Sequence, residues 1–77
     1  MSSQKGRIYP PSTLLTARLA LGYTQLEVAQ AVGCSRPAIS LMERGLEIPS
    51  VYTALLLAKV LQVPVTELFP LKGGEQS

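Results

Sequence analysis

The sequence predicts an all-α fold in which five short helices form one compact domain. Hydroxyl side chains that can cap a helix stand before four segments, at Ser12, Thr24, Ser35 and Ser50. Glycines follow the first three segments and supply the positive φ that a tight turn requires. Within the segments, apolar residues recur at the three- and four-residue spacing of an amphipathic helix. A chain of 77 residues has room for a single domain with a small core.

The first helix is expected to begin after Ser12, to run to about Leu21 and to be ended by Gly22. Its apolar positions repeat with the period of a helix, so one face is expected to lie against the core. The residues expected on that inner face are Leu14, Ala17, Arg18 and Leu21.

The segment from Thr24 to Gly45 carries the most information. Thr24 and Glu27 have the T-x-x-E spacing of a capping box, so a second helix is expected to start near Gln25. Gly33 supplies the positive φ of a sharp turn and ends this helix. The residues expected to face inward are Leu26, Ala29 and Val32.

Ser35 is expected to cap a third helix that Gly45 ends. Its inward residues would be Ala38, Ile39 and Met42, and its outward residues Arg36, Pro37, Ser40, Leu41 and Arg44. Two short helices joined at a glycine have the geometry of a helix-turn-helix, which inserts its second helix into the major groove of double-stranded DNA. A plain helical hairpin inside a bundle is the alternative.

A fourth helix is expected from Ser50 to about Leu61, after a short connection at residues 46–49. One apolar face would consist of Val51, Ala54, Leu55, Ala58 and Leu61, and a second row of Tyr52, Leu56 and Val60. A helix that is apolar on most sides must pack against other protein segments on most sides. Pro64 is expected to open a last helical turn from Val65 to Phe69.

Composition argues against an enzyme. The chain has no histidine, no aspartate and one cysteine, so it lacks the usual acid–base residues and cannot build a clustered zinc site. Its glycines form no phosphate-binding loop, and we expect neither a metal nor a cofactor. Cys34 is interpreted as a small buried hydrophobic residue, with redox sensing as the alternative. The net charge of +2 is compatible with nucleic acid but does not indicate it.

The ends of the chain and its location are also predicted. Residues 1–11, with Lys5 and Arg7, are expected to form a flexible arm, residues 12–70 the DNA-binding domain and residues 71–77 a flexible tail. Such an arm can reach DNA; an untethered tail is the alternative. Lys59 interrupts the longest apolar run, so no membrane span is expected. The start of the chain lacks the apolar core of a signal peptide, and we expect a cytoplasmic, nucleoid-associated protein.

From about Leu14 to Phe69 the sequence resembles the phage lambda-repressor and Cro-like helix-turn-helix family of XRE-type transcriptional regulators. The resemblance covers most of the chain, and many matches fall in register. The matching residues are Arg18, Gly22, Tyr23, Thr24, Gln25, Ala29, Gly33, Ser35, Ile39, Ser40, Glu43, Arg44, Gly45, Pro49, Ser50, Ala58, Leu61, Val63, Leu68 and Phe69.

The resemblance implies specific roles for the matching positions. Gln25 resembles a family glutamine that contacts a phosphate or helps to position the recognition helix. Ser35 and Arg44 lie where the family contacts the DNA backbone, and Arg18 and Glu43 resemble a pair that ties the first helix to the recognition helix. The positions that face bases in the family are occupied here by Arg36, Pro37, Ser40 and Leu41.

Three of these residues leave their exact contacts open. Arg36 can bind guanine O6 and N7 in a bidentate way, or a phosphate instead. Pro37 disfavours α geometry at the preceding residue, so Arg36 is a second candidate for the cap position. Leu41 can pack on a thymine methyl group, or it is an exposed leucine without a role.

The third-to-fourth helix connection is often basic in the family but here contains Leu46, Glu47 and Ile48. Few phosphate contacts imply modest affinity for a single copy, so a homodimer is expected. Its two recognition helices would lie ~34 Å apart on a near-palindromic operator. The alternative is that some of the interface residues fill the monomer core. The expected interface residues are Leu46, Ile48, Tyr52, Leu56, Val63, Val65 and Phe69.

The leading hypothesis is therefore a sequence-specific, DNA-binding transcriptional regulator that acts as a homodimer. Without a second domain or an evident effector pocket, it would repress by blocking polymerase or activate by touching it, and repression is the expectation. The alternative is a protein-interaction module, such as an antitoxin-like partner that uses a helix-turn-helix scaffold. The weak net charge favours that alternative.

Overall fold

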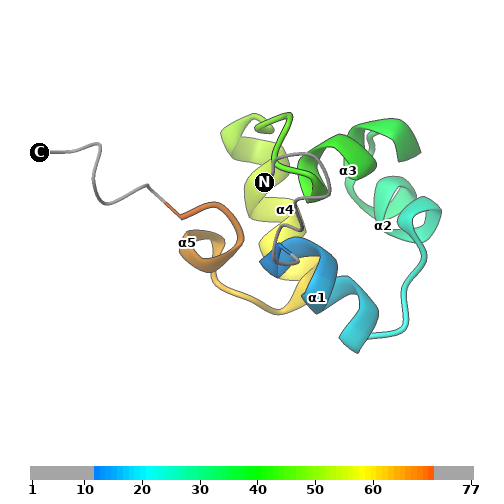
Figure 1. Cartoon of the computed structure of the whole chain (residues 1–77), viewed down its shortest axis with the longest axis horizontal. Coiled ribbons are helices and arrows are strands. Elements are labelled where there is room, and N and C mark those ends of the chain that lie inside the picture. The colour runs from blue at the N-terminus through cyan, green and yellow to red at the C-terminus, as the bar shows by residue number, and fades with distance from the viewer. Residues whose placement is uncertain (1–11, 71–77) are drawn as a thin grey trace, which may run out of the picture.

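The computed structural model describes residues 12–70, and these residues form five helices and no strand (Figure 1). The helices agree with the predicted limits to within one residue, so the all-α, five-helix fold is confirmed. The arm expected at residues 1–11, with Lys5 and Arg7, and the tail expected at residues 71–77 lie outside the described residues. In chain order the helices are α1 (Thr13–Ala20), α2 (Gln25–Val32), α3 (Arg36–Glu43), α4 (Val51–Leu61) and α5 (Val65–Leu68).

The first four helices begin at the hydroxyl residues that the sequence predicts. A backbone N–H three residues later donates to the hydroxyl oxygen at 3.1 Å for Ser12, 3.1 Å for Ser35 and 3.2 Å for Ser50. In α2 the capping box is complete: the Glu27 N–H donates to Thr24 Oγ1 over 3.0 Å, and the Thr24 N–H donates to Glu27 Oε1 over 2.8 Å. Each cap stabilises its helix by about 1 kcal/mol, so one or two residues determine where each helix starts.

The same four helices also end alike, each with one residue in the left-handed region. Gly22, Gly33 and Gly45 have φ values of 79°, 77° and 74°, and Gln62 has a φ of 61°. The N–H of the next residue then donates to the carbonyl five positions earlier, over 2.9 to 3.2 Å, which satisfies a carbonyl of the last turn. Within residues 12–70, Gln62 is the only non-glycine residue with a positive φ. Helix α4 therefore bears the cost of a Cβ in this conformation.

Helix α4 packs against α1, α2 and α5 and contributes to the core with them (Figure 1). Helix α2 packs against α3 and α4, and α1 packs against α3, α4 and α5. Of the helices in residues 12–70, none has both the length and the apolar character required to cross a membrane. The core residues are Leu14, Val28, Ala29, Val32, Ile39, Met42, Leu57, Leu61 and Leu68.

The predicted inner faces of α1 and α2 need correction. Leu21 and Leu26 were expected in the core, but both are exposed. Leu21 lies beyond the end of α1, in the turn that Gly22 completes. In α2 the buried residues are Val28, Ala29 and Val32, so the buried face is rotated away from Leu26, towards Val28 and Val32.

The prediction for α4 is also wrong in part. Val51 and Leu55 were placed on the inner face and are exposed, whereas Leu57, which belonged to neither predicted row, is fully buried. The buried residues of α4 are Ala54, Leu57 and Leu61, at helical spacing. Because α4 is apolar on several sides, periodicity alone does not fix which side faces α2 and α5.

Candidate nucleic-acid interface

Helices α2 and α3 and the tight turn between them form one helix-turn-helix unit. Gly33 ends α2, Ser35 caps α3, and Arg36 is the first residue of α3, followed by Pro37. The alternative in which Arg36 takes the cap position is therefore wrong. A proline in the first turn does not interrupt α3 because its missing N–H has no partner within the helix there.

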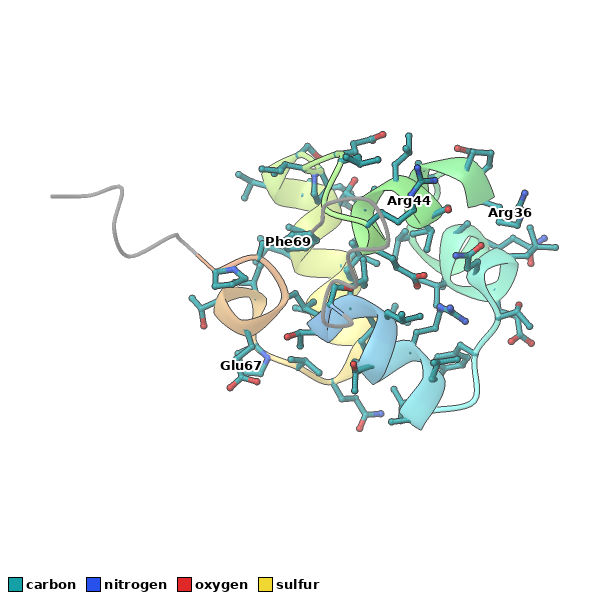
Figure 2. All side chains as sticks on the ribbon, in the orientation of Figure 1. Arg36, Arg44, Glu67 and Phe69 are labelled. Carbon is teal, nitrogen blue, oxygen red and sulfur yellow. The ribbon has the colours of Figure 1, made fainter. Side chains whose placement is uncertain are left out.

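One side of α3 is buried and the other faces outward. Its buried residues are Ile39, Met42 and Glu43. Figure 2 shows Arg36 and Arg44 near opposite ends of the helix. Both arginines are exposed, and so two positive charges stand along α3 with little protein around them. Of the other residues expected to contact DNA, Ser35 and Pro37 are exposed, and Gln25, Ser40 and Leu41 are half-buried.

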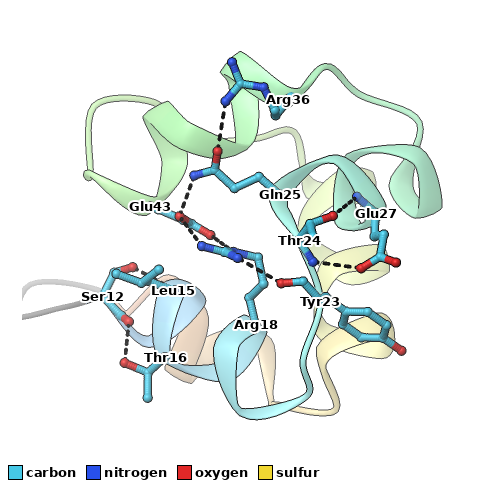
Figure 3. Close-up of polar contacts among 10 residues, drawn as sticks. All are labelled: Ser12, Leu15, Thr16, Arg18, Tyr23, Thr24, Gln25, Glu27, Arg36 and Glu43. Carbon is cyan, nitrogen blue, oxygen red and sulfur yellow. Dashed lines mark hydrogen bonds and ion pairs between the residues drawn. The ribbon is translucent and has the colours of Figure 1, made fainter.

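A buried ion pair joins α1 to α3. Both residues are only 8% exposed: Arg18 from α1 and Glu43 from α3. Arg18 Nε donates to Glu43 Oε2, and Arg18 Nη2 donates to Glu43 Oε1 over 3.3 Å, so the contact is bidentate (Figure 3). Arg18 Nη1 donates to the Tyr23 carbonyl over 2.9 Å. Such a pair holds α1 and α3 in a fixed relative position, because removing one partner leaves a buried charge unpaired.

Gln25, the first residue of α2, links this ion pair to the exposed end of α3. Its Nε2 donates to Glu43 Oε1 over 2.9 Å, and its Oε1 accepts from Arg36 Nη1 over 3.1 Å (Figure 3). The opposite amide orientation would place oxygen against a carboxylate and nitrogen against a guanidinium, so these two partners define the orientation. One continuous chain of hydrogen bonds therefore runs from the Tyr23 carbonyl to the Arg36 guanidinium.

This network does two things for α3. It ties the C-terminal end of the helix to α1 through Glu43, and the N-terminal end to α2 through Arg36. Its contact to Arg36 comes from a neutral amide, so the network pairs this guanidinium with no carboxylate. The remaining N–H groups of the Arg36 guanidinium are available to an acceptor outside the protein. The arrangement can present a positioned cation to a phosphate or to a base edge.

Cys34 lies in the turn between α2 and α3. It is half-buried, its N–H donates to the Ala29 carbonyl over 2.9 Å, and its side chain packs against the core. Burial raises the pKa of the Cys34 thiol, and the Glu47 carboxylate raises it further. Because the thiolate is the reactive form of cysteine, this environment favours the interpretation of Cys34 as a small hydrophobic residue over redox sensing.

The residues predicted to form a dimer interface fall into two groups. Leu46, Ile48 and Tyr52 are exposed. Leu56, Val63, Val65 and Phe69 are half-buried, and all of these except Val65 pack against the core of their own chain. The alternative that some of these residues fill the monomer core thus applies to Leu56, Val63 and Phe69.

Sequence reasoning missed two features of this region. The Tyr23 carbonyl completes the contacts of Arg18, but a backbone group leaves no signal in the sequence. The exposure of Val51 and Leu55 was also missed, because both are apolar residues at core-like spacing. Within residues 12–70, no three histidine, cysteine, aspartate or glutamate side chains come together as a metal site would require.

Comparison with known proteins adds one finding to this geometry. A family model described as helix-turn-helix matches residues 14–68, from the second residue of α1 to the last residue of α5. The match therefore spans well over half of the 77-residue chain. No curated protein and no solved structure matches the chain.

Proposed function

Because the chain belongs to the lambda-repressor-like, XRE-type helix-turn-helix family of DNA-binding regulators, we propose that it is a transcriptional repressor with a specific operator. It binds this operator as a homodimer, with one α3 helix of each copy in the major groove of a near-palindromic site. The family is one of regulatory DNA-binding domains and not of enzymes. A protein with this activity works in the cytoplasm, at the nucleoid.

The observation that carries this proposal is the fixed position of Arg36. A guanidinium that is exposed at the start of α3 yet bound to Gln25 loses little side-chain freedom when it meets DNA. Arginine that contacts guanine O6 and N7 in a bidentate way is the commonest specific contact in the major groove. We therefore assign base recognition mainly to Arg36, with Pro37, Ser40 and Leu41 as its neighbours on the outward face.

The other predicted residues have supporting roles in this proposal. Ser35 and Arg44, at the two caps of α3, are suited to phosphate contacts. The Gln25 amide donates to Glu43 and accepts from Arg36, so it positions the recognition helix from inside the protein. Leu41 supplies an apolar contact to a thymine methyl group.

Substitution of Arg36 tests the proposal. With duplex DNA selected by the protein from a random pool, Arg36→Ala is expected to weaken binding by about 1–3 kcal/mol for each half-site, because each copy loses a bidentate base contact. The matched control is Lys59→Ala, which removes an exposed cation of α4 and is expected to leave the affinity unchanged. If Arg36→Ala bound the selected DNA as tightly as the unsubstituted chain, recognition by this residue would be excluded.

A protein-interaction module is the second candidate, and the charge balance favours it. Over residues 12–70 the four cations are matched by four carboxylates, so this part of the chain is neutral overall. The cations are Arg18, Arg36, Arg44 and Lys59, and the carboxylates are Glu27, Glu43, Glu47 and Glu67. Binding to random duplex DNA separates the two candidates: a regulator binds less tightly as salt rises, whereas an interaction module shows no such dependence.

A further inference from the structure

The clearest feature outside the α3 surface is a run of exposed apolar side chains where α3 leads into α4. Five such residues lie within ten positions of one another, in the connection and on the first two turns of α4. We call them the α4 patch. They are Leu46, Ile48, Val51, Tyr52 and Leu55, with exposed fractions of 64%, 82%, 76%, 72% and 53%.

We propose that the α4 patch is the surface through which two copies of this chain pair, with the start of α4 in one copy packed against the start of α4 in the other. The pairing is two-fold, so the same five residues are contributed by both copies. This inference rests on the homodimer of the proposed function and names its interface.

The exposed area of the α4 patch is large enough for pairing with a second copy of the chain. Five large apolar residues that are each more than half exposed offer on the order of 600 Å² per copy, or about 1,200 Å² for a pair. That value is at the lower limit of stable protein interfaces. A monomer that left this area in water would carry an apolar patch at the upper end of what soluble monomers show.

Charge also favours a second copy over nucleic acid as the occupant. None of the five residues is charged, and Lys59, one turn beyond Leu55, marks the far end of the patch. Apolar side chains gain nothing from phosphates. At the near end, exposed Arg44 and half-buried Glu47 flank Leu46. A two-fold pair therefore brings both signs of charge to each rim and meets no obligatory like-charge contact.

The patch is continuous with the DNA-binding surface. The Leu46 N–H donates to the Leu41 carbonyl over 2.9 Å, so the first residue of the patch is joined to the last turn of α3. Pairing through the patch would set the spacing of the two α3 helices directly. A single copy presents only Arg36 and Arg44 along α3, and so the binding surface is incomplete without its partner.

This interface differs from the one that the sequence predicts. It keeps Leu46, Ile48 and Tyr52 and adds Val51 and Leu55. It leaves out Leu56, Val63 and Phe69, which pack against the core of their own chain, and the half-buried Val65 of α5.

Sedimentation of single glutamate variants of the full chain tests the interface. Val51→Glu places a carboxylate in the first turn of α4, where the helix dipole favours it, so the fold is not at risk. It brings two carboxylates together across the two-fold axis and is expected to raise the dimer dissociation constant at least about 30-fold. Ile48→Glu, in the connection, is expected to act in the same way. Leu19→Glu, which alters a leucine of α1 that is 60% exposed, is the matched control.

The outcomes separate this inference from the proposed function. Dissociation by Val51→Glu and Ile48→Glu, with Leu19→Glu still dimeric, supports the α4 patch. A dimer that survives both substitutions, or a chain that is monomeric at tens of micromolar, overturns it, even where the chain still binds its selected DNA. A dimer of this kind that binds no DNA supports the interface and refutes the regulator.

Discussion

At the scale of single residues, the bidentate contact between Arg18 and Glu43 is the most consequential interaction. It lies in the interior, at 8% exposure for each partner, and joins the first helix to the recognition helix. An exposed pair contributes only about 0–1 kcal/mol. Here the cost of stranding one buried charge is the larger effect.

Glu43→Ala is therefore expected to lower the free energy of unfolding by about 3–5 kcal/mol, because Arg18 is left buried without its carboxylate. Urea denaturation followed by circular dichroism measures this loss. The double variant Arg18→Met with Glu43→Leu replaces the pair with apolar residues and is expected to lose less than Glu43→Ala. A loss below about 1 kcal/mol for Glu43→Ala would mean that the pair behaves like a surface contact.

Cys34 gives a prediction about pH. Burial, and then the Glu47 carboxylate, raise the pKa of its thiol in the folded chain. The rate of alkylation by iodoacetamide is expected to rise with pH through a higher midpoint in the folded than in the unfolded chain. Glu47→Gln should lower the folded midpoint. Equal midpoints in both states would contradict the shift.

The same shift has a consequence for stability. The folded chain retains the Cys34 proton to a higher pH than the unfolded chain does. This contribution to stability is fully present below the unfolded pKa and is lost as pH rises through the folded pKa. Denaturation of Cys34→Ala, compared with the unsubstituted chain across the alkaline range, isolates this contribution.

At the scale of helices, α1 to α4 each end with a residue of positive φ, and Gln62 of α4 is the one such residue that is not glycine. It adopts a φ of 61° where the other three helices use glycine. Gln62→Gly removes the cost of the Cβ and is expected to raise the free energy of unfolding by about 0.5–1 kcal/mol. The opposite change, Gly33→Ala, meets no atom within 4 Å, so its destabilisation would come from the backbone alone. Thermal unfolding measures both, and a destabilised Gln62→Gly would refute this account of the α4 terminus.

The limits of the helices could be predicted because they depend on a few adjacent residues. A hydroxyl and a glycine set the start and end of α2 whatever lies around it. Which side of a helix is buried depends on its neighbours, however. Several sides of α4 are apolar enough to be the buried face. Only packing against α2 and α5 places Leu57 inside and Val51 outside.

At the scale of the whole molecule, the cations that contact phosphates determine how DNA binding depends on salt. Each phosphate contact contributes about −0.9 to the slope of log K against log salt concentration. Arg44→Gln removes one such contact from each copy, so the slope of a dimer is expected to become shallower by about 2, with unchanged base preference. Lys59→Gln should leave the slope as it is. An unaltered slope for Arg44→Gln would exclude a phosphate contact by Arg44.

The candidate site was also only partly predictable. The resemblance to known regulators implied a contact between Arg18 and Glu43, which the structure shows. It did not imply that Gln25 bridges Glu43 to Arg36, because that contact requires three side chains from separate positions to meet. In the proposed function, this network positions the Arg36 side chain at the start of α3 through Gln25.

We propose that α3 recognises DNA sequence through Arg36 in a two-fold symmetric pair. Sequencing the duplexes that the protein selects from a random pool tests this most directly. We expect an enriched, near-palindromic motif whose half-sites each contain a guanine. For Arg36→Ala, the preference for that guanine should disappear while neighbouring preferences remain. A pool with no enriched motif, or a motif that Arg36→Ala leaves intact, would contradict the claim.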